Sequence, residues 1–107
     1  MVKYILINVT FNNLKEAKKI SKILLNNRLV SCVQIIPKII SLYWWKNEIQ
    51  ESEEYLCIYK TKSFLFKKIE NIILENHSYE VPEIISIKLS KCNKKYLNWI
   101  DEYTKIL

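Results

Sequence analysis

The chain has 107 residues, of which 50% are hydrophobic and 26% are charged, and its formal net charge at pH 7 is +6. This length fits one domain over residues 1–107 that can bury a hydrophobic core. The sequence contains no glycine, which excludes the glycine-rich phosphate loops of dinucleotide-binding and Walker-type proteins.

The positive charge does not predict nucleic-acid binding. Arg28 is the only arginine among the 17 basic residues, whereas phosphate and base recognition favour the guanidinium group. The lysines are scattered along the chain and form no basic stripe. We attribute the charge to the lysine-rich composition and expect no nucleic-acid partner.

The apolar segments and the cysteines indicate where the protein resides. No run of residues is long and apolar enough to cross a membrane, and the N-terminal apolar run is too short for a secretory signal. Cys32, Cys57 and Cys92 form neither a disulfide framework nor a zinc-binding spacing. We therefore expect a cytoplasmic protein that does not insert into a membrane.

The first third of the chain predicts a strand followed by a helix. Residues Val2–Thr10 are rich in β-branched and aromatic side chains, which favour a strand. Apolar residues then recur at helical spacing from Leu14, with Asn13 as the N-cap and Glu16 as its capping-box partner. Asn26–Asn27 should end this helix by taking the left-handed conformation that glycine usually adopts.

The middle of the chain predicts a long β-hairpin. A strand is expected over Leu29–Trp45, with a bulge at Pro37 because proline cannot donate to the ladder. Lys46–Asn47 forms the turn, and the returning strand runs from about Ile49 to Thr61.

The last third predicts a second helix, a loop, a short strand and a final helix. Ser63 is the expected cap of the second helix, which ends near Asn76. Residues 77–83 read as an irregular loop that carries a proline. A strand follows over Ile84–Leu89, and Asn93 caps the final helix.

The resulting order, β-α-β-β-α-β-α, predicts an α+β fold: a ferredoxin-like (split βαβ) antiparallel sheet with an added C-terminal helix. The strands carry apolar residues on both faces, since Val30 and Cys32 alternate with Val33 and Ile35. Two helices can bury one face only. We therefore predict an obligate oligomer whose other sheet face is covered by another chain.

The loop over residues 77–83 contains the only histidine, His77, together with two carboxylates and a phenol. Imidazole and carboxylate donors suit copper, nickel or zinc. Alternatively, His77 satisfies the carbonyl groups at the end of the second helix. Cys32 offers a thiolate that attracts cuprous copper, or it is a small buried side chain, and Cys57 is expected in the core.

Three further features have alternative explanations. The neighbouring Trp44 and Trp45 should point to opposite faces, one into the core and the other toward a partner chain or a pocket. Lys60 shares its strand face with apolar residues, so its ammonium group either turns inward to pair with Glu51 or Glu83 or reaches solvent. The acidic residues of the returning strand should form a solvated face.

No arrangement of residues predicts catalysis. With one histidine and one aspartate, Asp101, in the chain, a Ser-His-Asp set is excluded. We expect a protein that is not an enzyme.

Several segments, in this order, resemble the CutA divalent-cation-tolerance family. The resemblance runs from Val2 to about Tyr103 and rests on motifs with family-like spacing: Ser31–Pro37, Ser41–Lys46, Lys60–Lys62, His77–Glu83 and Asn93–Ile100. It implies a PII-like homotrimer of ferredoxin-like subunits whose long hairpins extend onto their neighbours. It also implies binding of divalent cations, chiefly copper.

The resemblance assigns site residues by position. Cys32 matches the family's cysteine-containing strand, and His77, Tyr79, Pro82 and Glu83 match its His-Pro-Tyr-Glu-like loop. The residues that match positions around the clefts between subunits are Lys60, Trp45 and Tyr96. Two residues depart from the family: Ser78 replaces a proline that would stiffen the loop, and Asn47 replaces a glycine at the hairpin tip.

We therefore expect a trimer that binds a divalent metal ion through His77, with Cys32 or Glu83, near a cleft between subunits. The alternative is a PII-like sensor that binds a small anionic ligand in a cleft lined by Lys60, Glu51, Trp45, Tyr79 and Tyr96. A third possibility is a scaffold whose function is to trimerise.

Overall fold

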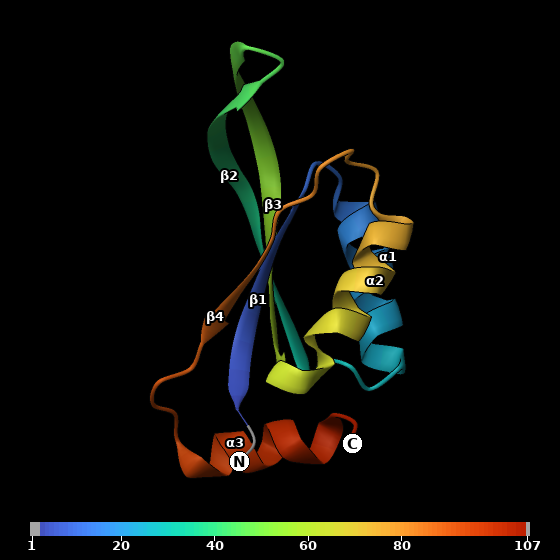
Figure 1. The fold of residues 1–107 in the computed structure, drawn as a ribbon, viewed down its shortest axis with the longest axis vertical. Coiled ribbons are helices and arrows are strands. Elements are labelled where there is room, and N and C mark those ends of the chain that lie inside the picture. Colours follow the sequence, from blue (N-terminus) through green and yellow to red (C-terminus); the bar gives the residue numbers. More distant parts are fainter. Residues whose placement is uncertain (1–2, 107) are drawn as a thin grey trace.

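The computed structural model describes residues 3–106 as one four-stranded antiparallel sheet with three α-helices (Figure 1). The elements follow the predicted order and confirm the ferredoxin-like α+β fold with its added C-terminal helix. Their bounds are β1 Tyr4–Phe11, α1 Leu14–Asn26, β2 Cys32–Trp45, β3 Glu48–Lys62, α2 Phe66–Asn76, β4 Ile84–Lys88 and α3 Lys94–Tyr103, with a 3₁₀ turn over Ser63–Leu65 before α2.

The sheet has the strand order β2-β3-β1-β4, and the β2–β3 hairpin projects well beyond the other strands (Figure 1). Its tip turns through Lys46 and Asn47, both with positive φ (50° and 63°), which a type I′ turn requires. The predicted bulge is confirmed, since the register shifts between Ile36 and Ile39 and Lys38 has φ 58°.

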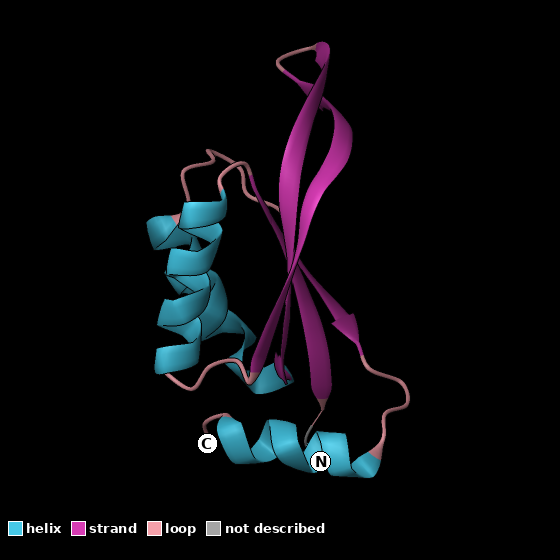
Figure 2. Ribbon diagram, turned by 180° about the vertical axis from the view of Figure 1, so that it is seen from behind, coloured by secondary structure: helices cyan, strands magenta, loops and turns pink. Residues whose placement is uncertain are grey.

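Helices α1 and α2 lie together on one face of the sheet, while α3 lies across its lower end (Figure 2). The side chains of β1 alternate accordingly: Ile5, Ile7 and Val9 are buried beneath the helices, whereas Leu6 and Asn8 point the other way and are half-buried. The helix-covered face is therefore the core of the subunit.

The core contains polar groups that satisfy one another. Ser21 of α1 lies 3.1 Å from the hydroxyl of Tyr59 on β3, and the Cys57 thiol is 4.0 Å from the same serine oxygen. Burial raises the pKa of both Tyr59 and Cys57. The prediction that Cys57 belongs to the core is confirmed.

The opposite face of the sheet has no helix on it within the described chain (Figure 2). Several aliphatic side chains stand half-exposed there: Ile36, Ile85 and Ile87 are 44%, 51% and 46% exposed. The two-faced apolar pattern of the strands thus corresponds to one covered and one uncovered face.

The helix ends differ from the prediction in three places. Asn13 accepts a hydrogen bond from the Glu16 amide as expected, but the Glu16 carboxylate accepts from Ser78 and does not complete a capping box. Asn27 has φ −90°, and Arg28, with φ 58°, takes the left-handed conformation. Ser63 makes no side-chain cap because a 3₁₀ turn precedes α2.

Most strand boundaries are close to those predicted. Val2, the expected start of the first strand, lies outside the described residues. Strand β2 begins at Cys32 and not at Leu29, because the Leu29 amide continues the end of α1 by bonding to the Leu24 carbonyl. The predicted cap of α3 is confirmed, since the Asn93 side chain accepts from the Tyr96 amide.

A buried lysine holds α3 against the sheet. Lys62 is 2% exposed, donates to the carbonyls of Asp101 and Lys105, and lies 3.5 Å from the Asp101 carboxylate. The hydroxyl of Tyr4 donates to that carboxylate at 2.6 Å, and this hydrogen bond raises the pKa of Tyr4 to about 12. The C-terminal helix is thereby tied to β1 and β3.

Candidate functional site

His77 directly follows α2, and its side chain is fully buried. The ring stacks on Phe11, with ring centroids 4.5 Å apart. Its Nδ1 accepts from the Tyr79 amide at 3.0 Å, so Nε2 carries the proton and donates to the Thr10 carbonyl at 2.8 Å. The His77 imidazole thus satisfies a carbonyl group of β1 and not, as the sequence suggested, one of α2, whose Ile73 carbonyl instead accepts from the His77 backbone amide at 2.8 Å.

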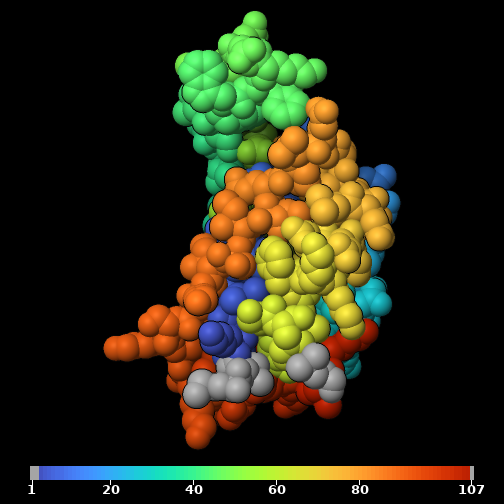
Figure 3. All heavy atoms as spheres, viewed as in Figure 1, coloured from blue at the N-terminus to red at the C-terminus, as the bar shows by residue number. Residues whose placement is uncertain are grey.

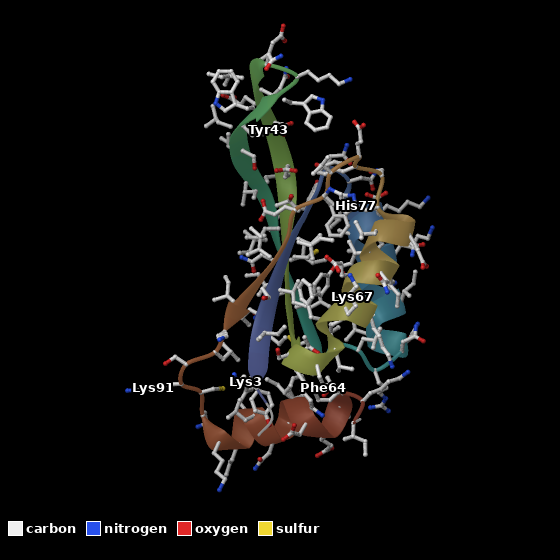
Figure 4. All side chains as sticks on the ribbon, in the orientation of Figure 1. Lys3, Tyr43, Phe64, Lys67, His77 and Lys91 are labelled. Carbon is white, nitrogen blue, oxygen red and sulfur yellow. The ribbon has the colours of Figure 1, made fainter. Side chains whose placement is uncertain are left out.

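The His77 loop is also tied to the start of α1. The Glu16 carboxylate lies 3.9 Å from Nδ1 of His77 and accepts a hydrogen bond from the Ser78 hydroxyl at 2.9 Å. The Ser78 hydroxyl thus gives the loop a hydrogen bond that a proline at this position could not supply. The loop is therefore anchored to β1 through the His77 imidazole and to α1 through Ser78, and Figure 4 shows where His77 lies beside the ends of the helices.

A cleft of about 720 Å³ opens between the hairpin and the loop over residues 77–83. Figure 3 shows this loop, in orange, reaching toward the green hairpin. The cleft has aromatic walls and acidic groups, supplied chiefly by Tyr43, Trp44, Trp45, Glu54, Tyr79 and Glu83. Three of these residues, Trp45, Tyr79 and Glu83, are predicted site residues.

The acidic groups of the cleft influence one another. The Tyr79 hydroxyl donates to Glu54 at 2.6 Å, and Glu54 is only 7% exposed. Burial, together with the Glu54 charge, raises the pKa of Glu83. Burial and then the bond to Glu54 raise the pKa of Tyr79.

A second group of predicted site residues lies at the α3 end of the sheet. Cys32 is the cross-strand neighbour of Lys60, and the Lys60 ammonium lies 5.2 Å from the centre of the Tyr96 ring. No carboxylate among the described residues comes within 4.0 Å of that ammonium. Lys60 therefore contacts an aromatic ring in this chain and does not form the expected ion pair with Glu51 or Glu83.

Within one chain the predicted site residues are thus divided between two places. His77 and Glu51 belong to neither: the buried His77 ring stacks on Phe11 and does not line the cleft, and Glu51 lies on the projecting hairpin opposite Leu42. Neither tryptophan enters the core, in contrast to the prediction for one of them, because Trp44 and Trp45 are 71% and 37% exposed. Both tryptophans line the cleft instead.

Sequence reasoning missed Glu54, which it assigned to a solvated acidic face. The residue lies one position beyond Tyr55, the partner of the last residue of β1, Phe11. The loop over residues 77–83 passes this point and covers Glu54 through Tyr79. The signal in the sequence was the unequal length of the paired strands: β3 has 15 residues and β1 has 8, so Glu54 lies just beyond the end of β1.

The metal ligands expected from the sequence, His77, Cys32 and Glu83, do not come together in one chain. Among residues 3–106, no three His, Cys, Asp or Glu side chains lie close enough to hold a metal ion. The described helices also include none that is long and apolar enough to cross a membrane.

Comparison with known proteins identifies relatives from plants, animals and prokaryotes. Protein CutA 1, chloroplastic, from Oryza sativa is 35% identical, covering 97% of this chain and 59% of the rice protein. Mouse Protein CutA is 38% identical over 91% of this chain and 55% of its own length. The chain thus spans little more than half of these relatives. It covers 93% of the divalent-cation tolerance protein CutA of Thermus thermophilus, at 36% identity.

Solved structures agree with these matches. The crystal structure of Oryza sativa CutA1 superimposes with a TM-score of 0.93 at 35% identity, covering 97% of this chain and 95% of that one. The periplasmic divalent cation tolerance protein CutA of Archaeoglobus fulgidus gives 0.92 at 36% identity, covering 95% and 99%. The family model for the CutA1 divalent ion tolerance protein matches residues 5–103. The resemblance read from the motifs is confirmed, and the chain belongs to the CutA1 divalent ion tolerance family.

Proposed function

We propose that this protein is a homotrimer that binds a divalent metal ion, with copper as the candidate ion, and so supports tolerance to divalent cations. It acts by binding and not by catalysis. We place it in the cytoplasm, as the sequence suggests, although the related Archaeoglobus protein is described as periplasmic and the rice protein as chloroplastic.

Exposed apolar side chains on the hairpin support the trimer. Leu42, Trp44 and Ile49 are 67%, 71% and 67% exposed. They share one side of the hairpin, since Trp44 pairs directly with Ile49 and Leu42 lies two residues before Trp44. Together with the uncovered sheet face, they form a surface that a soluble monomer rarely exposes.

The metal proposal depends on one observation, the 3.9 Å distance between Nδ1 of His77 and the Glu16 carboxylate. Imidazole nitrogen and carboxylate oxygen are suitable ligands for cupric copper. To bind through Nδ1, the metal must replace the Tyr79 amide as its partner. The described residues of one chain bring no third ligating side chain to this pair, so we assign a further ligand, Cys32 or Glu83, to a neighbouring subunit.

Calorimetric titration with copper tests this proposal. The wild-type trimer should bind copper saturably, and His77→Ala should lose at least about tenfold in affinity, as removal of one of a few ligands does. Glu53→Gln, a change on the exposed hairpin, serves as the control. Equal affinity and stoichiometry for wild type and His77→Ala would remove His77 from the site. A monodisperse monomer in light scattering would overturn the trimer.

A second candidate function is suggested by Lys60, whose ammonium has an aromatic neighbour but no carboxylate partner among the described residues. Such a group could bind a small anion. A thermal-shift screen separates the two functions: anion sensing predicts stabilisation by phosphate or nucleotides that is lost in Lys60→Met. A scaffold predicts stabilisation by neither anions nor metals.

A further inference from the structure

Helix α1 concentrates positive charge on one of its faces. Although lysines are found along the whole chain, Lys15, Lys18, Lys19 and Lys22 lie within two turns of this helix, and all four are exposed. Residues three or four positions apart are neighbours on the surface of a helix. In contrast to the expectation from the sequence, the protein therefore carries a basic stripe, formed by these four residues and called the lysine face below.

The lysine face points away from the core of the subunit. The buried residues of α1 include Ala17, Ile20 and Leu24, and the helical spacing puts them on the side opposite the lysines. Figure 2 shows α1 and α2 on the covered side of the sheet. The surfaces that the proposed trimer would bury are the hairpin and the uncovered side of the sheet, so the lysine face is directed away from them.

The described chain does not neutralise this charge. Among residues 3–106, none of the four lysines has a carboxylate within 4.0 Å. Glu16, the one acidic residue of α1, accepts a hydrogen bond from Ser78. The lysines repel one another at spacings of three and four residues, and Lys15 stands in the first turn, where the helix dipole disfavours a positive charge. An anionic partner would relieve both effects.

The composition of this surface favours a lipid membrane over a nucleic acid. Helix α1 contains no arginine and no aromatic residue, the side chains that bind phosphate groups in pairs of hydrogen bonds and stack on bases. Lysine attracts an anionic lipid surface through its charge alone. Leu25, three residues after Lys22, is 38% exposed, so an apolar side chain borders the lysine face. A basic helix surface of this kind is typical of proteins that lie on a membrane.

We propose that the lysine face of α1 is a docking surface for membranes that contain anionic phospholipid, and that the protein attaches to them reversibly without inserting. The apolar side of α1 is buried in the core, so the attachment is electrostatic. Each lysine near an anionic membrane strengthens binding about fivefold. The proposal does not depend on metal binding at His77, and the two can fail separately.

Vesicle co-sedimentation of the assembled protein, in chelator-treated buffer, tests this proposal. Vesicles of mixed phosphatidylserine and phosphatidylcholine are compared with vesicles of phosphatidylcholine alone. We expect the protein to bind the mixed vesicles only, because phosphatidylcholine carries no net charge. Binding should weaken as the salt concentration rises, since salt screens exposed charges.

Two double variants separate the lysine face from the overall charge. Lys18→Gln with Lys22→Gln removes two charges of the face and should weaken binding to the mixed vesicles by at least about tenfold. Glutamine favours a helix about as well as lysine does, and the variant loses a repulsion, so we expect it to fold. Lys91→Gln with Lys95→Gln removes the same charge from exposed residues near the start of α3 and should bind nearly as the wild type does.

The proposal is overturned if the protein binds neither kind of vesicle or binds both equally. It is also overturned if the two double variants lose binding to the same extent, since the effect would then reflect overall charge. If duplex DNA at an equal phosphate concentration displaces the protein from the mixed vesicles, the partner is a nucleic acid and not a membrane.

Circular dichroism and light scattering establish that Lys18→Gln with Lys22→Gln folds and assembles. If it does not, Lys15→Gln with Lys19→Gln replaces it, with weaker binding again expected.

Discussion

The core beneath the helices and the projecting hairpin place very different demands on the same type of residue. Beneath α1 and α2, Ile7 is fully buried, whereas Ile40 on the projecting hairpin is 66% exposed. The covered face is complete within one chain, because its polar groups find partners there. The hairpin and the uncovered face carry exposed apolar side chains that no helix of residues 3–106 covers, and these are the surfaces that the proposed trimer would bury.

The largest effect should come from replacing isoleucine by alanine in the core, and the same replacement on the hairpin provides the comparison. Ile7→Ala leaves a cavity in the core and should lower the free energy of unfolding by about 2–5 kcal/mol. Ile40→Ala should change the stability of an isolated subunit by less than about 0.5 kcal/mol. Urea unfolding at several protein concentrations separates subunit stability from assembly. If Ile7→Ala and Ile40→Ala lowered the free energy of unfolding equally at low protein concentration, the comparison would be contradicted.

The hairpin should affect assembly more than folding. In the proposed trimer the hairpin is a subunit contact, where burying an apolar side chain contributes about 1.5–3 kcal/mol, so Trp44→Ser should make subunit dissociation at least about tenfold easier. Analytical ultracentrifugation measures the change. Lys91→Ser, on the loop before α3 (Figure 4), is the control. A Trp44→Ser protein that assembles as tightly as wild type would show that the hairpin face is not a contact.

Two lysines extend the comparison to charged groups. Lys62 is buried and bonds to two carbonyl oxygens, whereas Lys67 pairs with Glu70 on the surface and its side chain is 79% exposed. Lys62→Met should lower the free energy of unfolding by about 1–2 kcal/mol and speed hydrogen exchange in α3. Lys67→Met should cost less than about 0.5 kcal/mol. If α3 exchanges no faster in Lys62→Met, the buried lysine does not anchor the helix.

The smallest effect is a change in the pH dependence of stability. Burial and the Glu54 charge raise the pKa of Glu83 above its ordinary value of 4.5. The folded state therefore holds this proton more tightly than the unfolded state, and stability falls as pH rises from about 4.5 through the raised value. Glu83→Gln should remove this fall, as measured by thermal unfolding across that pH range. If the stability of Glu83→Gln falls with rising pH as steeply as that of the wild type, the assignment to Glu83 is contradicted.

The local signals in the sequence predicted most of the fold. Asn13 and Asn93 cap their helices, and Pro37 marks the bulge, because each acts through its own backbone neighbourhood. A local prediction was wrong where a residue distant in the sequence competes for the same side chain. Glu16 bonds to Ser78 and not to its own helix end, since a loop that arrives 62 residues later offers a better partner.

The site was predicted only in part for the same reason. Tyr79, Glu83 and Trp45 do meet in one cleft, but Glu54, the most buried of its carboxylates, was not foreseen. Glu54 is buried because β1 ends beside it and the loop over residues 77–83 passes over it. The separation of Cys32 from His77 is likewise a property of the folded sheet that spacing along the chain does not reveal.

The absence of glycine affects the unfolded chain as well as the folded one. Four of the described residues adopt positive φ: Arg28, Lys38, Lys46 and Asn47. This conformation costs most residues other than glycine roughly 1–2 kcal/mol each. A chain without glycine also has fewer backbone conformations to lose when it folds. The restricted unfolded ensemble offsets the strain in the turns, so replacing Lys38 or Lys46 with glycine should relieve strain with little net gain in stability.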